Sequence, residues 1–212
     1  YTAENVKTSA YLMGNKSEAP MSIYSPSIVS TYAGYNDAAI ITITRSGWEN
    51  GDILSHNVPG HSNADNHMLM LDDNEKLLVA HAKQYFDKVI VLINSSNIMQ
   101  IPELAEEKTS SNLGVDAILW IGGVGNTGIN AVGGILNGSI NPSGKTVDLW
   151  EKDFTKGPTW TNFGTMGHNK DTSGNRLDTF YYDKNDKVTN FASVEYREGI
   201  YSGYKYYETL YA

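Results

Sequence analysis

Residues 38–44 read AAIITIT, a short run of apolar and β-branched residues without a charge or a turn former. An uninterrupted run of this kind is typical of a strand that is covered on both faces. Two later runs are also mainly apolar: KVIVLI at Lys88–Ile93 and VDAILWI at Val115–Ile121. Helical segments separate these runs. The alternation predicts an α/β fold, a three-layer α/β/α sandwich with a mostly parallel sheet and helices on both faces.

The helical segments are marked by capping and spacing signals. Asp72 can cap a helix, and Glu75 stands three residues later, which is the spacing of a capping box. Apolar residues then recur at helical spacing up to Phe86. A second helix is predicted at Thr127–Leu136, after a glycine-rich turn, and Lys145–Leu149 is a candidate for a further strand.

The remaining segments are polar or aromatic. Residues 1–36 are irregular, and residues 157–192, rich in Gly, Asn, Asp, Thr and Tyr, are expected to form a long loop excursion. The tail at residues 194–211 is aromatic and partly alternating, so we expect it to pack back on the domain. The sequence contains neither internal repeats nor a clear linker, and we therefore treat residues 1–212 as a single domain.

Composition excludes several classes of function. The chain has 16 basic and 24 acidic residues, a net charge of −8, which argues against nucleic-acid binding because that depends on clustered Lys and Arg. No apolar run has the length of a membrane span. The absence of Cys excludes disulfides and thiolate chemistry. Because the chain starts at Tyr1 and not at Met, we expect it to come from a longer polypeptide, and the compartment stays open.

The loop after the first strand carries two acids. Glu49 and Asp52 follow the strand directly, at the end where α/β sheets gather their functional loops. A carboxylic acid beside the apolar surface of Trp48 can have a raised pKa and act as a general acid. The alternative interpretation is a turn in which the polar side chains cap backbone groups.

Two further patterns can each be interpreted either as a ligand site or as ordinary turn and loop structure. Gly123–Gly128 is a GxGxxG motif between a predicted strand and a predicted helix, and Asp148 follows at about the distance of a ribose-binding acid. Such glycines also form tight turns without a ligand. The histidines of the 56–67 stretch, with Asp65, match no helix-borne metal pattern, so we expect a solvated loop and predict neither a metal nor a cofactor. These histidines are His56, His61 and His67.

Six motifs in order resemble the C-terminal α/β-sandwich domain of glycoside hydrolase family 3, the β-glucosidase type. The resemblance covers most of residues 20–211. Its first motif, RSGWENGD, resembles the family's R-x-S-G-E-G-x-D segment, with Trp48 where the family usually has Gly. The six motifs are Arg45–Asp52, Leu71–Glu75, Val89–Asn97, Ala117–Gly128, Gly138–Trp150 and Tyr196–Thr209.

The resemblance implies a retaining β-glucosidase-like enzyme that hydrolyses terminal β-D-glycosidic bonds. It makes Glu49 the general acid/base and places Arg45, Trp48 and Asp52 at the substrate. In this family the nucleophile is an Asp of a separate (β/α)₈ barrel domain, which this sequence does not encode. The expected partners are therefore a linked barrel domain and a β-linked glucoside or oligosaccharide. Two alternatives remain at this stage: a nucleotide-binding α/β module that uses Gly123–Gly128, and a non-catalytic scaffold or carbohydrate-binding domain.

Overall fold

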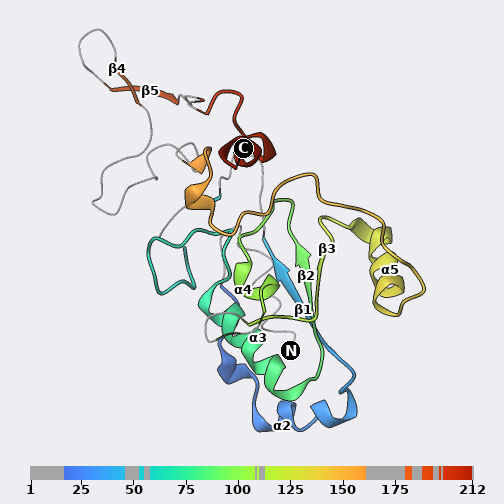
Figure 1. Cartoon of the computed structure of the whole chain (residues 1–212). Coiled ribbons are helices and arrows are strands. Elements are labelled where there is room, and N and C mark those ends of the chain that lie inside the picture. Colours follow the sequence, from blue (N-terminus) through green and yellow to red (C-terminus); the bar gives the residue numbers. More distant parts are fainter. Residues whose placement is uncertain are drawn as a thin grey trace.

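The computed structural model describes residues 17–45, 53–54, 58–107, 109, 113–160, 180–182, 188–192, 196 and 198–211. Its helices and strands follow one another as shown in Figure 1. In chain order they are η1 (Met21–Ile23), α2 (Pro26–Val29), η2 (Tyr32–Gly34), β1 (Ala39–Thr44), α3 (Asp73–Tyr85), β2 (Val89–Asn94), α4 (Pro102–Ala105), β3 (Ala117–Trp120), α5 (Gly125–Leu136), η3 (Phe154–Lys156), β4 (Phe180–Tyr182), β5 (Val188–Ala192) and α6 (Tyr204–Leu210).

A three-stranded parallel sheet lies at the centre, with the strand order β1-β2-β3. In its register Ile41 pairs with Val91, and Val91 pairs with Ile118. The backbone amides of Asp116 and Ile121 also donate to carbonyls of β2, so the pairing extends beyond both ends of β3. Parallel strands need crossover connections, which here contain α3 and α4. The α/β class and the three strands predicted from the apolar runs are confirmed, each strand within two residues.

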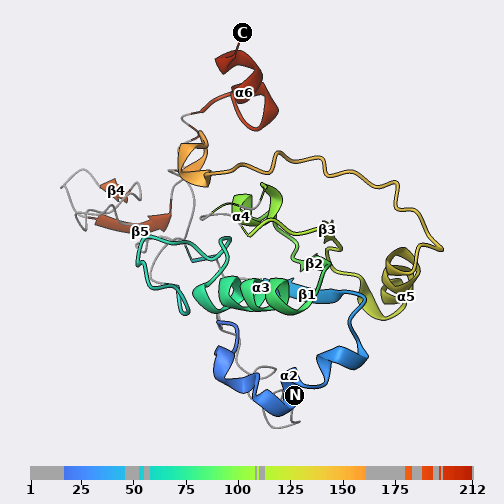
Figure 2. The same ribbon diagram turned by 60° about the horizontal axis from the view of Figure 1, so that its bottom comes forward.

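The core forms against one face of the sheet. Alternate residues of β1 and β2 point to this face, where they meet side chains of α3, of α4 and of the loop between β2 and α4. Figure 2 shows α3 running along the sheet. The buried cluster comprises Ile41, Ile43, Leu71, Val79, Ala82, Val89, Val91, Ile93, Met99, Ile101 and Leu104.

The two first strands differ in how completely they are covered. In the central strand β2, Leu92 on the opposite face is buried as well, as an apolar run predicts. In β1 only alternate residues are buried, and Ile40 on the opposite face is 51% exposed. The expectation that residues 38–44 are covered on both faces is therefore wrong for β1. The reason is its position, because β1 is an edge strand of the described sheet.

One other expectation is corrected. Lys145–Leu149 is not a strand: within the described residues no backbone hydrogen bond joins it to β3, and Val147 is 92% exposed. The described part of the aromatic tail contacts the rest of the chain through a hydrogen bond between the side chains of Tyr207 and Glu151. The tail ends in α6, which Figures 1 and 2 place away from the sheet beyond η3, with Tyr211 85% exposed. Much of the 157–192 excursion lies outside the described residues, and its described part pairs β4 with β5 as antiparallel strands.

In the part of the chain that the structure describes, no helix combines the length and the apolar character that crossing a membrane requires.

The one-sided burial of β1 allows a test within a single strand. Ile43→Ala removes a side chain that is 1% exposed, and it should lower the free energy of unfolding by about 2–5 kcal/mol because it leaves a cavity in the core. Ile40→Ala, in the same strand but half exposed, should cost less than about 1 kcal/mol. Urea denaturation followed by circular dichroism measures both. Equal losses would show that β1 is buried on both faces.

Candidate active-site edge

The carboxyl ends of the three parallel strands form one edge of the sheet, where α/β proteins place their functional loops. β1 ends at Thr44, and Arg45 follows at once. The amide of Arg45 donates to the carbonyl of Asn94 at 3.2 Å, so the backbone is still held to β2 at this point. The predicted residues Trp48, Glu49 and Asp52 lie outside the described residues. Arg45 is therefore the described anchor of the segment that carries them.

The Arg45 guanidinium is held from three sides. Its side chain is 9% exposed, and each of its five N–H donors has an acceptor. Two donors bind the carboxylate oxygens of Glu75 at 2.6 and 2.7 Å in a bidentate pair. The other three reach the carbonyls of Met68 at 2.6 Å, Met70 at 2.6 Å and Thr44 at 2.9 Å. Arg45 thus joins β1, the loop before α3, and α3 itself.

Glu75 also takes part in the N-terminal cap of α3. The side chain of Asp72 accepts from the amide of Glu75 at 2.7 Å, and Glu75 accepts from the amide of Asp72 at 2.8 Å. This capping box confirms the helix start that the spacing predicts. Burial raises the pKa of Glu75, and its hydrogen bonds with Arg45 act in the opposite direction. Asp72 also accepts from the amide of Glu18 at 2.7 Å, which ties the N-terminal segment to the same point.

A second buried cluster holds the loop before α3 against the chain beyond β2. Gln100 Oε1 accepts from the amide of Phe154 at 2.7 Å and lies 3.2 Å from Nε2 of His67. Because this oxygen is an acceptor, the geometry assigns the proton of the His67 ring to Nε2. The ring is 1% exposed and stacks on Phe154 with a centroid distance of 5.4 Å and an interplanar angle of 7°. Burial lowers the pKa of His67 to about 4.

Side chains also join the ends of β2 and β3. Asn94 donates to the carbonyl of Gly122 at 2.5 Å, and the indole nitrogen of Trp120 donates to the carbonyl of Ser95 at 2.6 Å. These bonds fix the turn that leads into the Gly123–Gly128 motif. There Gly125 has a φ of +63°, and α5 starts without a side-chain cap. A side chain at Gly125 would be strained, which explains the glycine without a ligand.

In the part of the chain that the structure describes, neither His61 nor His67 belongs to a metal site, and the solvated loop expected here is wrong for His67, which is 1% exposed. The ring nitrogen Nδ1 of His61 lies 3.3 Å from the Asn66 amide nitrogen, and His67 belongs to the Gln100 cluster. Among the described residues, no group of three or more His, Cys, Asp and Glu side chains is arranged to hold a metal ion. His56 lies outside those residues.

Sequence reasoning missed the partnership of Arg45 with Glu75. The capping box identified Glu75 as a helix cap, and the motif identified Arg45 as a substrate contact, but nothing local connects two residues that are 30 positions apart. That Arg45 contacts substrate stays a prediction. A signal was present, because a long basic side chain at the end of an apolar strand is rarely buried without a carboxylate partner.

The parallel sheet and the helices along it define an α/β domain. Residues 16–204 match the family model described as the glycosyl hydrolase family 3 C-terminal domain. The chain belongs to this family.

Similar proteins carry a common name. A beta-glucosidase of Ruminococcus albus is 26% identical over 184 residues, which is 87% of this chain and 15% of the relative. Beta-glucosidase A of Butyrivibrio fibrisolvens is 28% identical over 199 residues, which is 86% of this chain and 20% of the relative. The structure of beta-glucosidase 3B from Thermotoga neapolitana in complex with glycerol matches with a TM-score of 0.62 and 25% identity, over 99% of this chain and 25% of that one. The chain thus spans a quarter or less of these relatives.

The buried ion pair between Arg45 and Glu75 predicts a large loss of stability when one partner is removed. Glu75→Gln leaves the Arg45 cation buried without a counter-charge, and it should lower the free energy of unfolding by about 3–5 kcal/mol. The matched control is Glu106→Gln, which removes the partly exposed pair with Lys152 and should cost less than about 1 kcal/mol. Urea denaturation compares the two variants, and similar losses would contradict an anchoring role for Glu75.

The buried histidine predicts a fall in stability at acid pH. The folded pKa of about 4 lies below the usual value of 6.5, so the unfolded state binds the proton more readily. The contribution of His67 is complete above pH 6.5 and is lost as the pH falls through 4, by about 3 kcal/mol in total. His67→Gln should flatten the curve of unfolding free energy against pH in this window. NMR titration of His67 that gave a pKa near 6.5 would contradict the prediction.

Proposed function

We propose that this chain supplies the general acid/base, Glu49, to a β-glucosidase-like glycoside hydrolase that works with retention of configuration. Membership of the family supports the proposal, and so do the relatives that are named beta-glucosidases. The observation that carries it is the buried anchor at Arg45, four residues before Glu49 at the functional edge of the sheet.

The proposed reaction needs two carboxyl groups about 5–5.5 Å apart, flanking the glycosidic bond. Glu49 protonates the leaving oxygen in the first step and activates a water molecule in the second. The other carboxylate, which attacks the anomeric carbon, is by resemblance an Asp of a (β/α)₈ barrel domain in the same longer polypeptide. The active site is then shared, and the substrate is a β-linked glucoside or oligosaccharide bound between the two domains.

The anchor explains how a loop residue can act as an acid/base. A shift of the reacting group by about 1 Å can cost on the order of 10²-fold in rate, so the segment that carries Glu49 must be held in place. Five hydrogen bonds of the Arg45 side chain hold its N-terminal end. We propose that Trp48 and Asp52 contact the substrate on either side of Glu49, and that Arg45 contributes mainly by positioning.

Replacing Glu49 tests the assignment. In a full-length polypeptide that joins this chain to the barrel, Glu49→Gln should lower the rate on an aryl β-glucoside with a poor leaving group by about 10²–10⁴-fold, because departure then lacks a proton donor. A substrate with a good leaving group should be cleaved to the glycosyl-enzyme at a nearly normal rate. Added azide should then restore turnover, since it attacks the intermediate without needing a general base.

The control for this variant is Glu107→Gln, the same change at a loop carboxylate far along the chain from the proposed segment, and it should leave the rate unchanged. Circular dichroism and the melting temperature verify that both variants are folded. An undiminished rate of Glu49→Gln on the poor leaving group would reject Glu49 as the acid/base.

The shared site also predicts what the chain does alone. The purified 212-residue chain should fold and show no hydrolysis of aryl β-glucosides, because the proposed nucleophile is on the barrel. Adding a separately produced barrel domain is the complementary measurement. Turnover by the isolated chain, at a level that Glu49→Gln abolishes, would refute the division of the site between two domains.

A further inference from the structure

The C-terminal end of α5 carries an Asn-Gly pair, in which Asn137 is the C-cap of the helix and Gly138 follows it. Both residues are exposed. Asparagine is a thermolabile residue, and glycine after it favours its conversion because no side chain shields the glycine nitrogen. A second such pair, Asn50–Gly51, lies outside the described residues. The surroundings of Asn137 determine whether its side chain can react.

Three hydrogen bonds hold the pair in a closed cap. The amide of Gly138 donates to the carbonyl of Ile135 at 3.1 Å, and the amide of Asn137 donates to the carbonyl of Gly133 at 3.1 Å. The side-chain oxygen of Asn137 accepts from the amide of Ser139 at 3.0 Å. The ψ angle of Asn137 is 0°, which places the Gly138 nitrogen beside the backbone nitrogen of Asn137 and away from its side-chain carbonyl carbon. In the closed cap these two atoms cannot meet.

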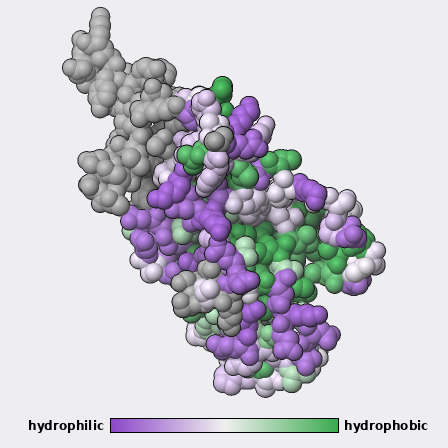
Figure 3. All heavy atoms as spheres, in the orientation of Figure 1, coloured by the Kyte–Doolittle hydropathy of each residue, from purple (hydrophilic) through white to green (hydrophobic). Residues whose placement is uncertain are grey.

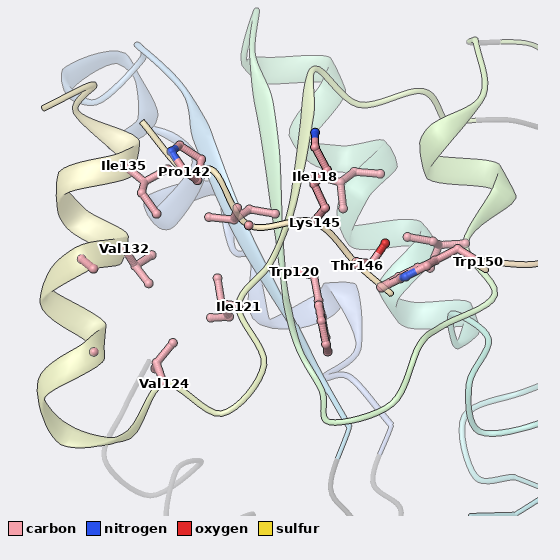
Figure 4. A pocket seen from close by; sticks show the side chains of 15 residues that line it. Ile118, Trp120, Ile121, Val124, Val132, Ile135, Pro142, Lys145, Thr146 and Trp150 are labelled. Atoms are coloured by element: carbon pink, nitrogen blue, oxygen red, sulfur yellow. The ribbon is translucent and has the colours of Figure 1, made fainter. Parts of the chain in front are cut away.

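Few apolar contacts keep α5 in place. The structure describes every residue of this helix, and Val132 is the only one of them that is buried. Figure 3 shows apolar atoms at the surface in the region between the sheet and α5, and Figure 4 shows Val132 and Ile135 directed from the helix toward the sheet. A pocket of about 610 Å³ borders the helix, and Gly128, Ala131, Val132 and Ile135 line it. The helix therefore covers part of the sheet without closing on it.

The sequence of α5 adds little stability of its own. The helix reads GNTGINAVGGIL, with four glycines, each of which disfavours a helix relative to alanine. Two of them, Gly133 and Gly134, lie in the last turn, directly before the cap. Segments with few buried apolar contacts and exposed hydrogen bonds open locally at a lower free energy than the whole domain. The last turn of α5 can thus open while the sheet stays folded.

We propose that Asn137 is a modification site, at which a succinimide forms when the last turn of α5 opens. The Gly138 nitrogen then attacks Cγ of Asn137. The new N–Cγ bond replaces the bond to Nδ2, and the proton of the Gly138 amide passes through water to this group, which leaves as ammonia. Water then adds to either carbonyl of the ring and produces aspartate or isoaspartate. The net reaction consumes one water and releases one ammonia, without a redox change.

The product weakens the end of the helix. Isoaspartate lengthens the backbone by one carbon, so the hydrogen bonds of the cap cannot form again in the same geometry. Both products add a carboxylate at the C-terminal end of α5, where the helix dipole is already negative. The proposal is independent of the glycosidase assignment, because it uses no residue of the segment that carries Glu49.

Peptide mapping by mass spectrometry tests the proposal. The 212-residue chain is incubated at mildly alkaline pH, either folded or in guanidinium chloride, and digested at intervals. Asn137 should react about 10–100-fold more slowly in the folded chain than in the denaturant, because only the open turn reacts. Equal rates would show that the cap gives no protection. A folded chain that stays intact at Asn137 after the denatured chain is fully converted would show that the turn does not open. Either result would overturn the proposal.

Three other asparagines are internal controls. Asn126 and Asn130 lie in α5 and are followed by residues with side chains, and Asn141 precedes Pro142, which has no N–H to lose. All three should remain unmodified during the time in which the denatured chain is converted at Asn137. Conversion of these residues in the folded chain as fast as Asn137 would show unspecific hydrolysis and refute the site.

Two variants test whether the helix controls the rate. Gly133→Ala strengthens the last turn, and its Cβ meets open space, so it should slow the reaction in the folded chain about fivefold. Val132→Ala removes the buried side chain of α5 and should speed the reaction about tenfold. The matched control is Gly144→Ala, whose Cβ also meets open space but which lies outside the helix, and it should not change the rate.

The same variants in guanidinium chloride separate the opening from the chemistry. There all of them should react at the rate of the unchanged chain, because the helix is absent. Circular dichroism verifies that each variant is folded before the denaturant is added. A rate in the folded chain that neither Gly133→Ala nor Val132→Ala changes would show that the reaction does not follow the opening of α5, and the proposal would fail.

Discussion

The bidentate pair between Arg45 and Glu75 is the contact on which the carboxyl edge of the sheet depends. It is buried, and an ion pair of this kind gains stability only when its geometry is good and its remaining donors and acceptors are satisfied. Both conditions hold, since three backbone carbonyls accept the other donors of Arg45 and the amide of Asp72 donates to Glu75. The pair thus connects the residue that follows β1 to the first turn of α3.

The two buried polar clusters divide the support of this edge between them. Arg45 and Glu75 hold the loop before α3 from the side of β1, whereas His67 and Gln100 hold the same loop from the side of β2 and η3. The hydrophobic core beneath is made by side chains of β1, β2, α3 and α4 and needs no polar partner. Stability therefore comes from the apolar layer and from the buried polar groups together, and the same few charged and hydrogen-bonded groups fix the course of the loops.

Local patterns predicted the parts of the structure that local physics determines. The apolar runs located the three strands, and the capping box located the start of α3 at Asp72. The expectations that were wrong concern residues whose surroundings are set by contacts far along the chain, which a local pattern does not contain. Ile40 is exposed because β1 is an edge strand, and Lys145–Leu149 is a candidate strand by its sequence but has no backbone hydrogen bond to β3 within the described residues. For the same reason the pattern could not identify Glu75 as the partner of Arg45, and Glu49 itself rests on the family motif.

The edge position of β1 has a consequence for handling the protein. Within the described residues, one side of this strand presents backbone N–H and C=O groups without a strand partner, next to the exposed side chain of Ile40. Natural sheets protect such edges with charges, prolines or bulges, and the stretch AIITIT has none of the three. Concentrated solutions of the separate chain are therefore prone to edge-to-edge association, and a lysine at position 40 is the simplest safeguard for crystallisation or storage.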